Sequence, residues 1–565
     1  MNASPSALGI GWPPVVERLL LARGWADREA ALQFCHPRLK DGLHPPSLMP
    51  DLDRAAERLL DAARARDHVV IYGDYDVDGI CATAILFHVL RAIAPDARLS
   101  TYVPHRIDEG YGLSCEAIEH LANDGAAVIV SVDCGATANE PAARARARGI
   151  DLIITDHHNL ASPLPEAYAL VHPARDDAYP YPHLCGAGVA FKLAWRLATM
   201  HQGSERVSSE MRETLLDMLA LAGLATIADV VPLTGENRII ARFGLSRTKH
   251  TRLTGLDALL KAAGLDGQRI GSEEAGFTLG PRLNAIGRLG HAKAAVELFT
   301  TAAPDRAAEI ASELNALNRA RQETERRIFD VAAERAEAAG MTGDGSRGIV
   351  LADEDWHPGV VGIVCSRLIG RFHRPAILMQ REEGRCRGSG RSIDGFNLHA
   401  ALVACAEHLD TFGGHDMAAG LALEASKLDA FMAAFLDHCN ERIGPELLVP
   451  PLTIDCEATL DELNLDAVRH LERLGPFGRD NPEPTFLLRD VRATSDAEPM
   501  GAQAKHMCVR VQQGTRQSRM IAWRWGEHRE QIRAGAVFDV AVRAKLNEWN
   551  GCVSVQPQIR DVRLS

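Results

Sequence analysis

The stretch VVIYGDYDVDGICATAILFHVL, from Val69 to Leu90, decides the fold predicted for this chain. Its first four residues predict a buried parallel strand, and an apolar pattern with helical spacing begins at Ile80. Asp74, Asp76 and Asp78 stand between the two, in the kind of turn where α/β folds bind their ligands. Three carboxylates crowded there repel one another unless a cation neutralises them. Taken alone, the stretch is equally compatible with an acidic, solvated turn in which one Asp caps the helix.

Three further apolar segments also deliver acids or histidines at or near their ends. They are AAVIVSVDCGAT (Ala126–Thr137) with Asp133, GIDLIITDHHNL (Gly149–Leu160) with Asp156, His157 and His158, and LAGLATIADVVPL (Leu221–Leu233) with Asp229. Four such ends, rich in carboxylate and imidazole, predict a metal cluster. Oxygen and imidazole ligands suit Mn²⁺ or Mg²⁺ better than a closed thiolate zinc site.

Length and composition describe a globular chain of several domains. Its 565 residues are enough for three or four domains, and 46% apolar with 24% charged residues is ordinary for soluble proteins. The 12 cysteines form no Cys-x-x-Cys pair, which argues against a zinc ribbon or a disulfide framework and fits a reducing cytoplasm. Residues 1–20 lack the pattern of a signal peptide. The most apolar run, Leu215 to Leu233, is broken by Asp217 and Asp229, so no membrane span is expected.

The formal net charge of −13 argues against a protein that binds DNA across its whole surface. It is compatible with binding in a lined groove, because the local field decides where a polyanion lies. The predicted acidic metal site accounts for part of the negative charge that bound cations would offset.

The motifs GDYDVDG, VDCG, TDHH and IADVVPL resemble the four motifs of the DHH phosphoesterase family. The SGRS and GGH elements (near 389 and 413) resemble the DHHA1 domain that accompanies it. Over almost its whole length the chain is similar to the family's single-strand-specific 5′→3′ DNA exonucleases. Tyr72 stands where related pyrophosphatases and small-nucleotide phosphodiesterases carry a metal-binding His, which favours the exonuclease branch.

The expected fold is α/β, with two α/β domains joined by a long helix and followed by a C-terminal OB-type β-barrel. Helical spacing of Ile310, Leu314 and Leu317 predicts the long helix, and the Asn550-Gly551 pair predicts a hairpin in the barrel. The expected domains are an N-terminal extension packing on domain 1 (1–50), the DHH catalytic domain with a parallel sheet (51–302), the connecting helix (303–340), the DHHA1 domain (341–445) and the barrel (446–565).

The resemblance implies two divalent ions, Mn²⁺ or Mg²⁺, in each active site. One would be held by Asp74, Asp76 and Asp133, and the other by Asp78, Asp133, His157 and Asp229, with Asp133 as the bridge. His158 would face the scissile phosphate, and Asp156 would orient the neighbouring imidazole. Such a two-metal-ion mechanism provides the nucleophile, neutralises charge at phosphorus and stabilises the leaving oxygen.

The resemblance also implies a set of residues that grip the 5′ end and the backbone of DNA: Arg106, Arg282, Ser389, Arg391 and His415. Arginine suits this task because its planar fork bonds two phosphate oxygens, although each arginine alone is equally compatible with a surface ion pair. The GSGRS segment is predicted to be a turn, and the helix beginning near Gly359 offers N–H groups to a phosphate. The Gly-rich start of Cys185–Leu197 is compatible with a phosphate nest, but tight helix packing is the favoured interpretation.

The barrel is expected to hold single strands through Trp523, Trp525 and Trp549 beside Arg524 and Lys545. The alternative is that the tryptophans are core residues. Strand alternation would place Trp523 and Trp525 on one face and Arg524 on the other, so at least one of the two tryptophans is expected in the core.

The predicted function is hydrolysis of single-stranded DNA from a 5′-phosphorylated end, with release of 5′ mononucleotides, in DNA repair and recombination. Two alternatives are a phosphodiesterase for short oligonucleotides or cyclic dinucleotides and an inactive replication scaffold with the same fold. The protein is expected to be a cytoplasmic monomer that binds no membrane. A single-strand-binding protein and a helicase are its candidate partners.

Overall fold

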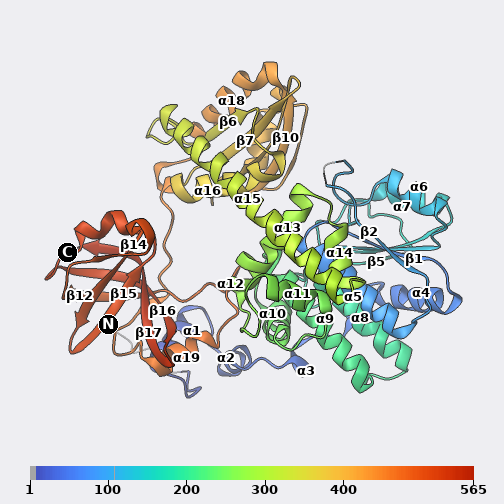
Figure 1. Cartoon of the computed structure of the whole chain (residues 1–565), viewed down its shortest axis with the longest axis horizontal. Coiled ribbons are helices and arrows are strands. Elements are labelled where there is room, and N and C mark those ends of the chain that lie inside the picture. Colours follow the sequence, from blue (N-terminus) through green and yellow to red (C-terminus); the bar gives the residue numbers. More distant parts are fainter. Residues whose placement is uncertain (1–7, 107, 565) are drawn as a thin grey trace. The chain divides into compact units, whose positions relative to one another are not determined.

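The computed structural model in Figure 1 describes residues 8–106 and 108–564. The chain divides into two compact units. The first contains Met1–Gly280, Val296–Ala307 and Thr453–Ser565, and the second contains Pro281–Ala295 and Ala308–Leu452.

The first unit contains a five-stranded sheet in which every strand is parallel to its neighbours, in the order β2-β1-β3-β4-β5. This confirms the parallel sheet predicted from the sequence. The central strands are continuous runs of buried apolar residues, because helices cover a parallel sheet on both faces. The strands are β1 (Val69–Gly73), β2 (Leu99–Tyr102), β3 (Val128–Val132), β4 (Asp151–Thr155) and β5 (Ala169–Val171).

Helices precede and follow the strands of this sheet and then continue as a helical region that extends into the second unit. They are α4 (Leu52–Ala65), α5 (Val77–Ile93), α6 (Cys115–Asn123), α7 (Asn139–Ala147), α8 (Gly186–Gln202), α9 (Ser209–Ala228), α10 (Gly235–Thr248), α11 (Thr254–Ala262), α12 (Ser272–Glu274), the π-helix η3 (Ala275–Leu279), α13 (Gly280–Leu289) and α14 (Lys293–Thr300). Helices α5, α8 and α9 are in mutual contact and carry long buried apolar faces. Their N- and C-terminal ends build the site described below.

The long helix predicted between the α/β domains is α15 (Pro304–Ala338), a single helix of 35 residues. Its first four residues belong to the first unit and the remainder to the second. The second unit also contains α16 (Pro358–Phe372), α17 (Leu398–Ala404) and α18 (Leu428–Arg442).

The sheet of the second unit is mixed, with the order β6-β7-β8-β10-β9. Its strands are β6 (Ile349–Asp353), β7 (Ala376–Glu382), β8 (Arg385–Arg391), β9 (Thr411–Gly414) and β10 (Ala418–Glu424). The prediction that GSGRS forms a turn is wrong, because its first four residues, Gly388 to Arg391, are the second half of β8. Its glycines permit close strand packing rather than a turn: a Cβ on Gly388 would lie 2.3 Å from the carbonyl oxygen of Leu378.

The C-terminal part is a closed barrel of the predicted OB type. Strand β12 pairs with both β16 and β14, so the ring β12-β16-β17-β15-β14 closes on itself. The predicted hairpin joins β16 to β17, and Asn550 and Gly551 have the positive φ angles, 49° and 76°, that its tight turn requires. The elements are β11 (Cys456–Glu457), α19 (Leu465–Glu472), β12 (Phe486–Ala493), β13 (Glu498–Met500), β14 (His506–Gln513), β15 (Arg516–Ala522), β16 (Val537–Trp549) and β17 (Cys552–Leu564).

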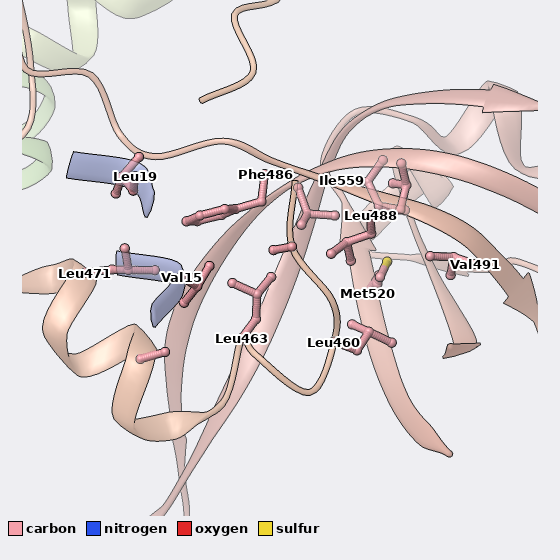
Figure 2. Close-up of a cluster of buried hydrophobic side chains, with 14 of the residues drawn as sticks. Val15, Leu19, Leu460, Leu463, Leu471, Phe486, Leu488, Val491, Met520 and Ile559 are labelled. Carbon is pink, nitrogen blue, oxygen red and sulfur yellow. The ribbon is translucent and has the colours of Figure 1, made fainter. Parts of the chain in front are cut away.

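The N-terminal extension packs on the barrel as well as on the catalytic region. Helices α1 (Pro14–Ala22) and α2 (Arg28–Cys35) contribute to one hydrophobic core with α19 and the barrel strands, and Figure 2 shows Val15 and Leu19 beside Leu471 and Phe486. The following part, which includes α3 (Leu39–Gly42), contacts helix α10 of the catalytic region, and Phe34 of α2 also contacts α10 through Arg238. Residues 8–35 therefore share a core with the barrel, which the sequence did not predict, and reach the catalytic region only at the end of α2. Amphipathic helices pack on whichever apolar surface is available, and that surface lies more than 400 residues away in the chain.

Among the described residues, no helix combines the length and the apolar character needed to cross a membrane.

Candidate metal centre

Three of the predicted site carboxylates follow directly after three neighbouring strands. Gly73, Val132 and Thr155 are the last residues of β1, β3 and β4, and they stand opposite one another in register. The next residues are Asp74, Asp133 and Asp156. The parallel sheet therefore delivers three carboxylates to a single edge, where α/β folds bind ligands.

The backbone at Asp133 is in the left-handed region, with a φ of 63°. An Asp in this conformation is uncommon, and such residues cluster where a side chain must be aimed at a site. Its N–H donates to the carbonyl oxygen of Thr155, which fixes the turn.

The N-terminus of α5 supplies two further carboxylates. Asp76 is the N-cap, and its Oδ1 accepts the N–H groups of Asp78 and Gly79. Asp78 is held from the other side by the first N–H groups of α8, since Gly186 and Ala187 donate to its two oxygens at 2.6 and 2.7 Å. The Gly-rich start of α8 therefore binds a carboxylate of the protein itself, an arrangement that differs from both a phosphate nest and simple helix packing.

Asp229 completes the set, but from a helix rather than a strand. It is the C-cap of α9, which runs from Ser209 to Ala228. The apolar run Leu221–Leu233 thus begins in the last two turns of α9. An apolar run is compatible with a buried helix as well as with a buried strand.

His157 lies at the centre of this group. Its Nε2 is 3.1 Å from Asp133 Oδ1, 3.6 Å from Asp229 Oδ2 and 3.7 Å from Asp78 Oδ2. Within the described residues, His157 Nε2, Asp133 Oδ1 and Asp74 Oδ1 are buried without a hydrogen-bond partner. Buried polar atoms normally have partners, so three orphaned ligand atoms facing one site fit a binding site for a cation.

The donor atoms fall into groups whose members lie within 4.8 Å of one another: Asp74, Asp76 and Asp133; Asp78, His157 and Asp229; and Asp133, His157 and His158. Carboxylate oxygens with one or two imidazoles fit Mn²⁺ or Mg²⁺. The first two groups correspond to the two ligand sets that the resemblance implies, apart from the bridging role of Asp133 in the second.

The electrostatics point in the same direction. Burial, together with repulsion from Asp76, raises the pKa of Asp74 to about 8. Burial and neighbouring carboxylates also raise the pKa values of Asp76, Asp133 and Asp229. Without a cation the cluster therefore disfavours its own ionisation, and a bound divalent ion removes that penalty.

His158 lies beside this cluster and differs from its other members by being a cation. Its Nδ1 lies 2.8 Å from Asp156 Oδ1, and Asp156 also accepts backbone N–H groups from Ala136, His157 and His158. Burial opposes the charged form of both side chains. Their mutual hydrogen bond outweighs it, lowering the pKa of Asp156 to about 2 and raising that of His158 to about 9. His158 is thus a fixed positive charge beside the carboxylates.

Tyr111 also belongs to the site, although it was not predicted from the sequence. Its hydroxyl donates to the carbonyl oxygen of Asp133 and lies 3.1 Å from Nδ1 of His158. Gly110 and Gly112 flank it with φ angles of 83° and 82°, which turn the loop so that the ring reaches the site. A tyrosine between two glycines in the loop that carries Arg106 was the available signal.

Comparison with known proteins identifies the family. Residues 68–223 match the DHH family, N-terminal domain, residues 345–441 the DHHA1 domain and residues 454–561 the RecJ OB domain. The chain is 36% identical over 555 residues to a single-stranded-DNA-specific exonuclease RecJ of Bacillus subtilis (strain 168), covering 98% of this chain and 68% of that protein. The chain belongs to the RecJ family.

Other RecJ proteins are similar to it in sequence and in structure. The Escherichia coli (strain K12) RecJ is 36% identical over 490 residues, covering 84% of this chain and 83% of that protein. The crystal structure of Thermus thermophilus RecJ in complex with Mn²⁺ aligns with a TM-score of 0.82 at 30% identity, over 99% of this chain and 76% of that one. A second crystal structure, exonuclease RecJ bound to manganese, aligns with a TM-score of 0.61 at 33% identity, over 71% and 97% of the two chains.

The residues expected to hold DNA in this RecJ-family chain are divided between the two units. Arg106 belongs to the first, where its guanidinium lies 5.0 Å from the centroid of the Tyr75 ring. Arg282 belongs to the second and donates through Nε to Asn315 Oδ1 of α15. Burial and the nearby charge of Arg319 lower the pKa of Arg282.

Ser389 and Arg391 lie on β8 of the second unit, two residues apart and therefore on one face of the strand. The guanidinium of Arg391 rests against α16, because a Cβ on Gly362 would lie 3.1 Å from Nη2 of Arg391. His415 is exposed in the turn between β9 and β10, and Ala418, at the start of β10, pairs with Arg391. The three residues thus gather at one end of this sheet.

The tryptophans of the barrel are not arranged by strand alternation. Strand β15 ends at Ala522, and Arg524 turns the chain with a φ of 65°, so the assumed strand through 523–525 is wrong. Trp525 packs against the barrel core, as expected for one of the pair, whereas Trp523 is exposed. Trp549 is the most exposed of the three at 73%, on the last residue of β16. Lys545 is paired with Glu483 and Glu273.

Proposed function

We propose that this chain is a metal-dependent exonuclease that hydrolyses single-stranded DNA from the 5′ end and releases 5′ mononucleotides. The observation that carries the proposal is the convergence of five carboxylates and an imidazole on one sheet edge, with three of their ligand atoms buried and unpartnered. The names of its RecJ relatives, which describe single-stranded-DNA-specific exonucleases, give the substrate class. A role in DNA repair and recombination accords with such an activity.

The proposed ligand sets follow the geometry of the carboxylates. Asp74, Asp76 and Asp133 would hold one ion, and Asp78, His157 and Asp229 would hold the other, with Asp133 close enough to serve both. When bound, two such ions neutralise charge on the reacting phosphate and activate water for attack. Because Asp78 is clamped by the N-terminus of α8, its carboxylate is aimed before any ion arrives.

The protein's own contribution at phosphorus is His158. Its raised pKa keeps the imidazolium charged at neutral pH, and Asp156 fixes its ring through Nδ1. The charged ring is then oriented to donate a hydrogen bond to a non-bridging oxygen of the scissile phosphate, where negative charge increases in the transition state. Tyr111 restricts the same ring from its exposed side.

We also propose that the 5′ end is recognised by cationic and hydroxyl groups. Ser389, Arg391 and His415 form one group at the end of the second sheet, and Arg106 and Arg282 contact the phosphate backbone. A terminal phosphate has more charge and more free oxygens than an internal diester, so charge-assisted bonds distinguish it. The helix α16 adds N–H groups near Gly359, although His357 already accepts the N–H of Gly359. Action as a cytoplasmic monomer, with a single-strand-binding protein and a helicase as partners, completes the proposal.

A cleavage assay with length-graded substrates tests it. Strands of 3, 12 and 40 nucleotides, labelled at either end, are incubated with the protein in Mn²⁺ or Mg²⁺, and again in excess EDTA. We expect labelled mononucleotide to appear first from the 5′ end, no cleavage in EDTA and recovery on adding either ion. Undiminished cleavage in EDTA would contradict the metal mechanism. Cleavage confined to the trinucleotide would indicate an oligonucleotide phosphodiesterase, and no cleavage of any strand an inactive scaffold.

A further inference from the structure

Two apolar side chains are exposed where the catalytic region of the first unit presents Asp229. Val230, the next residue, is 60% exposed, and Phe277 is 81% exposed. A single exposed apolar residue needs no explanation. Val230 and Phe277 are not such isolated cases. The backbone is unusual at both residues, and both lie at the same helix end.

Val230 adopts a φ of 56° directly after the C-cap of α9. A β-branched residue in the left-handed region is a real outlier, because its Cβ crowds the carbonyl oxygen. Strain of this kind persists where the surroundings impose it, and it clusters at functional sites. Here it accompanies an apolar side chain turned towards solvent, beside a proposed metal ligand.

Phe277 lies in the middle of η3, a π-helix from Ala275 to Leu279. Such segments are rare and occur frequently at functional sites. Two glycines let this segment lie against the end of α9. A Cβ on Gly276 would be 3.4 Å from Ile227 Cγ2, and one on Gly280 would be 3.6 Å from the Cβ of Ala228.

The aromatic ring is therefore carried on a backbone that is pressed against the two residues preceding Asp229. This packing involves only residues of the first unit. Nothing in the mechanism above uses Phe277, although it begins the Gly- and Arg-rich segment Phe277–Ala292.

We propose that Phe277 is a stacking platform for a base of the substrate strand, one or a few nucleotides from the cleaved phosphodiester. Val230 extends the apolar surface at the same helix end. Every base has a π-face, so an aromatic platform holds a strand without reading its sequence, and the polar edges of the base stay in water. The platform would hold the strand in register with the metal centre after each nucleotide leaves. This inference rests on the proposed function, because it requires single-stranded DNA as the substrate.

The test compares Phe277→Ala with Phe277→Trp on a 12-nucleotide strand and on versions with one abasic nucleotide at each of the first four positions. We expect Phe277→Ala to lower kcat/KM about 5- to 100-fold on the intact strand and Phe277→Trp to retain activity, since the loss is that of one stacked base. At one abasic position, wild type and Phe277→Ala should become nearly equal, which identifies the stacked base. Mn²⁺ affinity, measured by titration calorimetry, should be unchanged.

Val403→Ala is the matched control, because Val403 is a 52% exposed apolar residue on α17 of the second unit and should leave kcat/KM unchanged. The inference is overturned if Phe277→Ala cleaves like wild type, or if its loss is the same at every abasic position. A weakened Mn²⁺ affinity would equally overturn it, since the residue would then support the metal site. Failure of the wild-type protein to cleave in Mn²⁺ would instead contradict the proposed function.

Discussion

The two α/β sheets of this chain place charged residues in opposite ways. In the first unit all five strands are parallel, and the residues that follow β1, β3 and β4 are Asp74, Asp133 and Asp156. In the second unit the sheet is mixed, and Ser389 and Arg391 lie within strand β8. A parallel sheet collects strand ends at one edge and so concentrates carboxylates there. A cation offsets the repulsion between these carboxylates. A mixed sheet presents side chains from a strand face, which suits direct contact with phosphate.

The largest effect expected from this contrast concerns the bridging acid. Asp133→Ala should reduce kcat by about 10³-fold or more, because its carboxylate faces both ligand groups and several kcal/mol of charge stabilisation depend on the ions. Asp76→Ala should reduce it less, since Asp76 lies in only one group. Steady-state cleavage and the Mn²⁺ stoichiometry from calorimetry measure both effects. Asp124→Ala, on an exposed acid, is the control. Equal losses for Asp133→Ala and Asp76→Ala would contradict a bridge.

The next effect tests how closely the start of α8 packs against the proposed ligands. A Cβ on Gly186 would lie 2.5 Å from Asp133 Oδ1, so Gly186→Ala should displace a proposed ligand. We expect Mn²⁺ affinity to fall about 10- to 100-fold, as when groups behind metal ligands are removed. Gly188→Ala is the matched control on the same helix, where the nearest atoms would be 3.4 Å from the new Cβ. If titration calorimetry gave both variants the Mn²⁺ affinity of the wild type, α8 would not shape the site.

The variant Arg391→Ala tests the role proposed for the charged residues of the second sheet. We expect the preference for a 5′ phosphate over a 5′ hydroxyl to fall about 10- to 100-fold in kcat/KM, the value of a charge-assisted bond, with Mn²⁺ affinity unchanged. Two strands that differ only in the 5′ group provide the measurement. Arg387→Ala is matched to it, because Arg387 is exposed on the same strand and the same face. An equal loss on both strands would make Arg391 a general backbone contact.

The smallest effect lies in the barrel. Trp549→Ala should weaken binding of a 40-nucleotide strand about 5-fold and leave a 6-nucleotide strand unaffected, because one exposed aromatic on the barrel stacks one base and is not one of the groups around the metal centre. Fluorescence anisotropy measures both. Truncating the chain near Ile443 would be a poor substitute, since α1 and α2 would lose the core that they share with the barrel. Equal weakening of both strands would place Trp549 close to the active site.

Much of the fold could be predicted because its signals are local. The parallel strands, the long helix α15 and the Asn550-Gly551 hairpin each depend on the spacing of apolar residues or on a turn pair within a few positions. The errors arose where one local signal was compatible with two structures. GSGRS reads as a turn because it is rich in glycine, yet Gly388 is required by the nearness of Leu378 on the neighbouring strand.

The sequence by itself determined which side chains could form a metal centre, since Asp74, Asp133, His157 and Asp229 stand in motifs at the ends of apolar segments. Only the tertiary structure decided what surrounds them. In the folded chain the N-terminus of α8 donates hydrogen bonds to Asp78, the Tyr111 hydroxyl contacts His158, and helices α1 and α2 pack on the barrel. The physical reason is that hydrogen bonds and packing join residues brought together by the whole fold, whereas propensity and periodicity act over a few neighbouring positions.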